Sequence, residues 1–144
     1  MLYGYGVYQH NDGREYKGIF VDNKKSGEGT FTYPDGTRYS GEFKNDRFSG
    51  RGEYSFSDGS RYTGDFANGS FNGKGALFYS DGSKYKGEFR NDLPHGNGVL
   101  TSANGSRFEG LFKYGRREGK GRLEQTSGKI IEGTFHNDKL VTAP

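Results

Sequence analysis

Aromatic residues and glycines recur along this chain at a fixed spacing of 23 residues. One copy of the pattern runs Tyr39-Ser40-Gly41-Glu42-Phe43, and Gly50-Arg51-Gly52 and Asp58-Gly59 follow it. Within each copy, apolar and polar positions alternate with a period of two, which predicts short β-strands. Turn-forming residues bound every strand, and no stretch shows helical periodicity. A period of this length is typical of repeat proteins.

The repeats divide the chain into a regular series. A half-repeat over residues 1–15 opens it, and a second half-repeat over 131–140 closes it before a tail at 141–144. The full repeats cover 16–38, 39–61, 62–84, 85–107 and 108–130. We therefore expect one array over residues 1–144. It begins and ends inside a repeat, as a piece of a longer array would.

The turn sequences fix how the strands should pair. Pro34-Asp35-Gly36 predicts a three-residue hairpin loop with the glycine in the left-handed conformation. A loop of this length sets Phe31 opposite Tyr39, so that all the aromatic residues fall on one face of the sheet. The predicted fold class is all-β, an elongated, single-layer antiparallel meander of about twelve strands.

The second turn of each repeat must have an even length to keep the same faces together. Asn45-Asp46-Arg47-Phe48 is expected to form it, with Phe43 opposite Gly50 and Gly41 opposite Gly52.

Glycines run along the middle of the aromatic face, and rings flank them. Since glycine weakens a strand unless another group approaches the backbone closely, we expect the rings to lean over the glycines. This face should curl into a concave groove that suits an amphipathic helix or an extended segment of a protein partner. The expected groove residues are Tyr39, Phe43, Tyr54, Tyr62, Phe66, Tyr85, Phe89 and Phe108.

The opposite face is polar and carries a series of alternating charges, which we interpret as a solvated surface. A purely basic residue also recurs once per repeat. Such a stripe is suited to contact with anionic lipid head groups. Its members are Arg38, Arg61, Lys84 and Arg107.

Composition narrows the classes of function. Only 29% of the residues are hydrophobic, while 26 are glycine, so the chain can bury a thin aromatic layer but no thick core. A net charge of +3 is too small to indicate nucleic-acid binding. Cysteine is absent, which excludes disulfides and fits a cytoplasmic location.

No set of residues indicates catalysis. His10, His95 and His136 occupy different phases of the repeat, so we expect no metal site within one chain and no cofactor. The Gly-x-Gly pairs are not followed by a helix N-terminus, so they do not indicate a phosphate-binding loop. No nucleophile–base set stands apart from the repeat. The chain is therefore not expected to be an enzyme.

These residues resemble the MORN (membrane occupation and recognition nexus) repeat family. Tyr39-Ser40-Gly41-Glu42-Phe43, Gly50-Arg51-Gly52 and Asp58-Gly59 carry the family pattern, and Tyr85-Lys86-Gly87-Glu88-Phe89 repeats it. Phenylalanine stands where many members have tryptophan. The resemblance implies a scaffold at junctions of cytoskeleton and membrane, with a cytoskeletal or motor-associated protein segment as partner. It also implies phosphoinositide binding in some members and dimers through array ends in others.

Two further alternatives remain open on the sequence. The strands near Tyr5–Tyr8 and Ile131–Phe135 would leave unpaired edges, which favours self-association as a homodimer. A repeat that binds glycans is the other.

Overall fold

The computed structural model describes residues 3–142. Within them, thirteen strands follow one another in sequence order in one open antiparallel sheet, and no residue is helical. The predicted fold class is thus confirmed. The thirteenth strand arises because Lys139–Thr142 pairs with the strand before it, which brings Val141 and Thr142, placed in the tail above, into the sheet. Residues 1–2 and 143–144 lie outside the described part of the chain.

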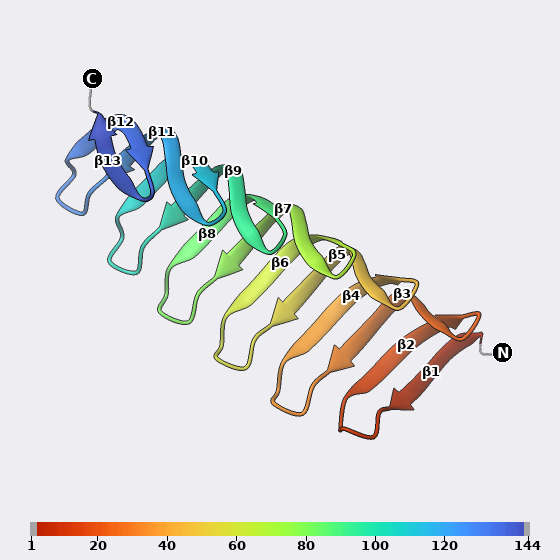
Figure 1. Cartoon of the computed structure of the whole chain (residues 1–144). Helices are drawn as coiled ribbons and strands as arrows, with labels where there is room; N and C mark the ends of the chain where they lie inside the picture. The colour runs from red at the N-terminus through yellow and green to blue at the C-terminus, as the bar shows by residue number, and fades with distance from the viewer. Residues whose placement is uncertain (1–2, 143–144) are drawn as a thin grey trace. The chain divides into compact units, whose positions relative to one another are not determined.

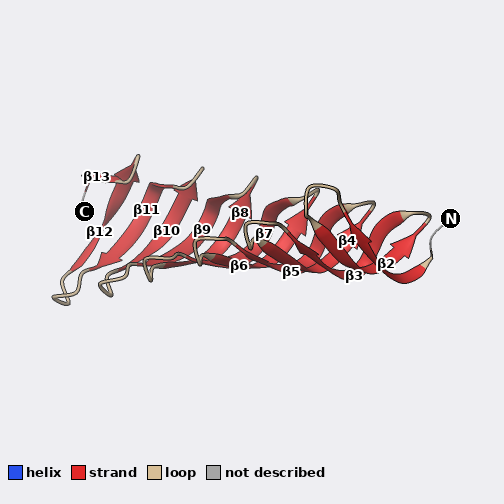
Figure 2. Cartoon of the chain, turned by 90° about the horizontal axis from the view of Figure 1, so that it is seen from below, coloured by secondary structure: helices blue, strands red, loops and turns tan. Residues whose placement is uncertain are grey.

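The chain forms two compact units, Met1–Ser70 and Phe71–Pro144. In each unit the three-residue loops emerge on one side and the shorter turns on the other (Figure 1). Figure 2 shows that the individual strands are bent along their length. The strands up to the end of the first unit are β1 Gly4–Gln9, β2 Glu15–Val21, β3 Lys24–Thr32, β4 Arg38–Lys44, β5 Arg47–Ser55 and β6 Arg61–Ala67. The remaining strands are β7 Ser70–Phe78, β8 Lys84–Arg90, β9 Leu93–Thr101, β10 Arg107–Lys113, β11 Arg116–Glu124, β12 Ile130–His136 and β13 Lys139–Thr142.

The longer loops have the predicted geometry. Between β3 and β4, the Tyr33 amide donates to the Thr37 carbonyl at 2.8 Å, which closes a loop of three residues. Gly36 has φ +94°, the left-handed conformation that favours glycine. The strands pair Phe31 with Tyr39, as the loop length predicts.

The shorter turns differ from the prediction. In the β4–β5 hairpin Lys44 pairs with Arg47, so the turn consists of Asn45 and Asp46 alone and not of four residues. Both have positive φ, 50° and 70°, as in a type I′ turn. An even length was predicted correctly, but Phe43 pairs with Phe48 rather than with Gly50.

A bulge in β5 reconciles the short turn with the pairing of Gly41 and Gly52. Between the Gly41–Gly52 pair and the Phe43–Phe48 pair, Glu42 on β4 faces a longer stretch of β5. This stretch includes Gly50 at φ +63°. The Glu42 carboxylate folds over Gly50 and accepts a hydrogen bond from the Arg51 amide at 2.6 Å. Glu88 does the same for the Asn97 amide at 2.7 Å. The same bulge occurs between β2 and β3 and between β10 and β11, where Ile19 and Leu111 replace the glutamate. The glycine is therefore common to these bulges, and the carboxylate is an additional contact.

Candidate functional site

The aromatic face is built on tyrosine rings that lie against pairs of glycines. Gly41 and Gly52 face each other on β4 and β5, and the ring of Tyr39 covers both. A Cβ atom on Gly52 would stand 2.6 Å from Cε1 of that ring. The hydroxyl of Tyr39 donates to the Glu42 carbonyl at 2.6 Å, so its polar end is satisfied while the ring is buried. The expectation that rings lean over the glycines is confirmed.

Phenylalanines join these tyrosines into a continuous layer inside each unit. In the first unit, Tyr39 meets Phe43 of its own repeat at 5.1 Å and Phe66 of the next at 5.0 Å, both edge to face. In the second unit, Tyr85 meets Phe89 and Phe112 in the same way, each at 5.0 Å. Edge-to-face pairs at these distances are favourable beyond the area that they bury.

A further position per repeat covers the tyrosine layer, and the sequence analysis missed it. Phe48 stacks on the Tyr39 ring, with centroids 4.0 Å apart and planes at 14°. At the equivalent position Lys25 places its ammonium group 5.6 Å from the Tyr16 ring, and Arg117 lies 5.4 Å above Phe108. We call this the cover position. Its members are Lys25, Phe48, Phe71, Pro94, Arg117 and Leu140.

The cover position was not predicted, because the four-residue turn expected for Asn45–Phe48 placed Phe48 in the turn and not in a strand. The signal was present in the sequence. Asn-Asp is a pair suited to the positive φ angles of a two-residue turn, and the 23-residue period brings one cover residue to every repeat.

Most of the predicted groove residues form the buried layer beneath the surface. Tyr39, Tyr62 and Tyr85 have no exposed surface, Phe43, Phe66 and Phe89 are each 4% exposed, and Phe108 is 2% exposed. Tyr54 is half-buried and reaches the surface of this face. The glycines along the middle of this face are therefore covered by rings.

The accessible part of the aromatic face in the first unit consists of half-buried rings. Tyr54 lies 4.8 Å from Phe56 and 6.0 Å from Phe48, while Phe31 lies 4.9 Å from Tyr33. Burial raises the pKa of Tyr33 above the usual value for a tyrosine. We name Tyr33, Phe48, Tyr54 and Phe56 the half-buried ring cluster.

The basic stripe lies at the first residues of β4, β6, β8 and β10, and each of its members is exposed. Acidic residues accompany part of it. Arg107 is 3.3 Å from Glu109, and Arg38 lines a shallow pocket of about 430 Å³ that Glu15 and Glu28 also line. Lys84 lies 5.7 Å from the centre of the Phe78 ring.

The family model for the MORN repeat matches residues 16–38, 39–61, 62–84, 85–107 and 108–130. The chain belongs to the MORN repeat family. No curated protein matches this MORN chain in sequence.

Among solved structures, the MORN chain is similar to the SAS-4 (dCPAP) TCP domain of Drosophila melanogaster in complex with a proline-rich motif of Ana2 (dSTIL). The likeness has a TM-score of 0.58 at 11% identity, and it covers 90% of this chain and 72% of that one. A second match is the TCP10 domain of Danio rerio CPAP, with a TM-score of 0.39 and 17% identity over 89% of this chain and 66% of that one. The Drosophila likeness shows a shared fold.

None of residues 3–142 of the MORN array belongs to a helix with the length and apolar character needed to cross a bilayer.

Proposed function

We propose that this MORN array is a non-enzymatic scaffold that binds a segment of a protein partner on its aromatic face. The observation that carries the proposal is the half-buried ring cluster of the first unit, whose rings lie above a layer of buried ones. The buried tyrosine layer is rigid, since every ring in it is held by neighbouring rings and by the glycines below. Rigid aromatic surfaces bind peptides with little loss of side-chain entropy.

The Drosophila domain of the same fold supports an extended partner, because its structure is a complex with a proline-rich motif. A proline-rich segment is already extended before it binds, and aromatic surfaces suit its rings. We infer a partner segment of this extended kind in preference to a helix. Family membership supports a cytoskeletal or motor-associated protein as the owner of the segment, and a cytoplasmic location near cytoskeleton and membrane.

A pair of substitutions tests this function without removing a buried ring. Ser102 occupies the repeat position equivalent to Tyr33 and Phe56, so the repeat itself tolerates serine there. We expect the double variant Tyr33→Ser, Phe56→Ser to keep the far-ultraviolet circular dichroism of the wild type. In affinity capture from native lysate it should lose the partner that the wild type retains.

The matched control is Val99→Ser, which alters the opposite face of the sheet. It should capture the partner as the wild type does. If the double variant retains the same partner, and direct titration with the purified segment confirms this, binding through the half-buried ring cluster is contradicted.

A second candidate function is binding to anionic phospholipid, phosphoinositides included. The second unit supports it, since residues 71–144 contain twelve Lys and Arg against eight Asp and Glu. Several of these basic side chains are exposed, among them Lys84, Lys86, Arg107 and Lys113. Sedimentation with vesicles of phosphatidylcholine and phosphatidylserine at low salt should carry the protein down, and Lys84→Glu with Arg107→Glu should reduce the bound fraction. Wild-type protein that stays in the supernatant contradicts lipid binding.

Self-association is a third element of the proposal. Strand β1 forms an edge of the described sheet, and Tyr5 and Val7 on it are 73% and 55% exposed. Unpaired strand edges with apolar side chains favour pairing with another chain. Light scattering at increasing concentration should show a dimer, and a monomer at every concentration would contradict this.

A further inference from the structure

One repeat position loses its ring in the second unit. The position is the residue before each three-residue loop. The amide of this residue donates a hydrogen bond to the carbonyl oxygen of the residue after the loop. The distance is 2.8 Å for Tyr33, Phe56, Ser102 and Gln125 alike, so the backbone is the same in each case. Rings fill this position up to Tyr79, and then Ser102 and Gln125 replace them.

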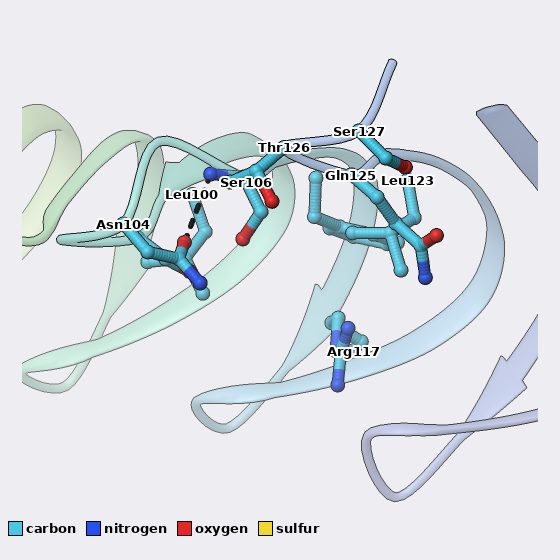
Figure 3. A pocket seen from close by; sticks show the side chains of 10 residues that line it. Leu100, Asn104, Ser106, Arg117, Leu123, Gln125, Thr126 and Ser127 are labelled. Atoms are coloured by element: carbon cyan, nitrogen blue, oxygen red, sulfur yellow. Dashed lines mark hydrogen bonds between the residues drawn. The ribbon is translucent and has the colours of Figure 1, made fainter. Parts of the chain in front are cut away.

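A pocket of about 380 Å³ opens where these two rings are missing. Its lining residues are Leu100, Ser102, Asn104, Ser106, Phe108, Arg117, Leu123, Gln125, Thr126 and Ser127. Figure 3 shows the polar side chains of the two loops around the opening, with Arg117 on the side away from the loops. The volume lies within the range of ligand pockets in proteins, at about 300–1,000 Å³.

The lining of the pocket is apolar at depth and polar at the rim. Phe108 is 2% exposed and belongs to the buried aromatic layer, and Leu100 and Leu123 flank it on the neighbouring strands. Asn104 and Ser106 are joined through the Ser106 amide and the Asn104 carboxamide oxygen, at 3.0 Å. An apolar body with a polar end therefore fits this site better than a purely apolar or a purely polar ligand.

The earlier repeats indicate the shape of the occupant. In the first unit, Tyr33 lies 4.9 Å from Phe31, and Phe56 lies 4.8 Å from Tyr54. The equivalent pairs in the later repeats are Leu100 with Ser102 and Leu123 with Gln125. Their smaller or non-aromatic side chains leave part of this place empty. The site is thus built to surround an aromatic ring that this part of the chain does not supply.

The charges around the pocket indicate what flanks the ring. Arg117, which also lies 3.5 Å from the Asp138 carboxylate, lines the pocket. Arg107, which pairs with Glu109, and Lys129 follow closely after the rim residues Ser106 and Ser127. Arg107 and Lys129 are exposed. With a charge of +4 over residues 71–144, this unit attracts a negative segment, whereas residues 1–70 carry a charge of −1.

We propose that this pocket binds an aromatic side chain of the partner segment, carried on a stretch of acidic residues. The inference rests on the proposed function and adds to it the place and the chemistry of one anchor. The incoming ring would meet the Phe108 ring and the leucine side chains, and its flanking carboxylates would lie near Arg107, Arg117 and Lys129. The pocket thereby sets the register of the segment on the second unit.

The probe for this site is the peptide acetyl-Glu-Glu-Phe-Glu-Glu-amide, titrated into the full chain and followed by backbone amide chemical shifts. We expect the shifts of Leu100, Phe108 and Leu123 to change most. Replacement of the peptide phenylalanine by alanine should weaken binding about tenfold, since burial of the ring and its edge-to-face contact are lost. Replacement of its glutamates by lysines should weaken binding further.

Two variants fill the pocket from within, with residues that the chain already uses at this position. Ser102→Tyr and Gln125→Phe restore the rings of the earlier repeats, and either should weaken peptide binding about tenfold. Val99→Tyr adds a ring to the opposite face of β9 and should leave binding unchanged. Thermal melts of all three check that each is folded, and a second filling variant stands in if one is not.

Four outcomes overturn the proposal. Two concern the peptide: binding is equal when alanine, or when proline, replaces its phenylalanine. Two concern the protein: a folded filling variant binds as the wild type does, or the chemical shift changes are confined to residues outside the pocket. If partner capture is lost in the Tyr33→Ser, Phe56→Ser variant while the filling variants bind the peptide as the wild type does, the proposed function stands and the pocket assignment fails.

Discussion

Tyr39 and Glu42 are linked by a hydrogen bond in which the tyrosine hydroxyl donates to the glutamate carbonyl oxygen, 2.6 Å away. The same glutamate uses its side chain on the other face to accept the Arg51 amide. One residue thus satisfies a buried hydroxyl through its backbone and a bulged amide through its carboxylate. Tyr62 and Asp65, and Tyr85 and Glu88, repeat the backbone bond at 2.7 and 2.8 Å.

The Tyr39→Phe variant should fold and be less stable, because the Glu42 carbonyl loses a buried donor. We expect a loss of about 1 kcal/mol in the free energy of unfolding, measured by urea denaturation. Phe108 occupies the equivalent position in the fifth repeat, so the ring itself fits without the hydroxyl. Tyr5→Phe, at a side chain that is 73% exposed, is the control and should change stability little. An equal effect of the two substitutions would contradict the role of the buried bond.

Alkaline pH should destabilise the array. Burial raises the pKa of Tyr39 and Tyr85 far above the usual value, because the phenolate cannot be solvated in the ring layer. A raised folded-state pKa means that the stabilisation is complete below the unfolded pKa of about 10 and is lost as the pH rises above it. Chemical denaturation at a series of pH values should show this fall.

The double variant Tyr39→Phe, Tyr85→Phe serves as the control for the alkaline series, and it should lose less stability over the same pH interval. A wild-type protein whose free energy of unfolding stays constant through the tyrosine titration range would disprove the linkage.

Gly52→Ala should be strongly destabilising. The new methyl group would stand 2.5 Å from the Tyr39 hydroxyl oxygen and 2.6 Å from Cε1, which forces the ring out of the layer. Overpacking of this kind costs about 1–3 kcal/mol, and a displaced core ring adds to it. The midpoint of thermal unfolding measures the effect.

Gly59→Ala is the matched control for Gly52→Ala. At Gly59 a new Cβ meets nothing within 4 Å, although φ is +94°. The substitution should cost only about 1 kcal/mol through the left-handed conformation. The argument from ring contact fails if Gly59→Ala proves the more damaging of the two.

Asp46 links the turn of one repeat to the preceding repeat. Its amide donates to the Lys25 carbonyl at 3.0 Å, and its carboxylate accepts the Lys25 amide at 2.8 Å. Asp46→Ala removes the acceptor and strains a residue at φ 70°, so we expect a loss of about 1–2 kcal/mol in unfolding free energy. Asp46→Gly keeps the conformation relaxed and should cost less.

The chain offers its own comparison for Asp46→Gly, since Gly69 has the equivalent place and retains the amide bond, to Phe48, at 3.0 Å. Guanidinium denaturation of both variants gives the order of stability. A glycine variant less stable than the alanine variant would show that backbone strain does not matter here.

Periodicity and side-chain alternation predicted the strands, the aromatic face and the three-residue loops, because these depend on local residue types. The turn at Asn45-Asp46 was predicted too long. Parity allows any even length, and only the bulge at Gly50 keeps Gly41 and Gly52 in register after a two-residue turn. That bulge holds Gly50 at φ +63° and is accompanied by the bond from the Arg51 amide to the Glu42 carboxylate, a contact across strands that face parity does not include.

The sequence predicted which residues form the aromatic face. It did not predict which of them are accessible. Tyr39 lies in the buried layer because Phe48 stacks on it and Phe66 of the next repeat meets it edge to face. Phe43 lies there too, since Tyr16 of the preceding repeat meets it edge to face. The pocket beside Phe108 depends on what Ser102 and Gln125 fail to fill. A pattern search that looks for recurring rings passes over such a place, since its signal is the interruption of the pattern.

The reciprocal bonds between Asp46 and Lys25 join residues only 21 positions apart, and those between Asp92 and Phe71 repeat the arrangement. Repeats of this kind contact the one before through these backbone groups and one carboxylate, together with the ring contacts between neighbouring repeats. Duplication or deletion of a stretch of 23 residues would therefore recreate the same interfaces without any compensating change. The length of such an array is free to vary during evolution, while the cover position and the residue before each loop can change one repeat at a time.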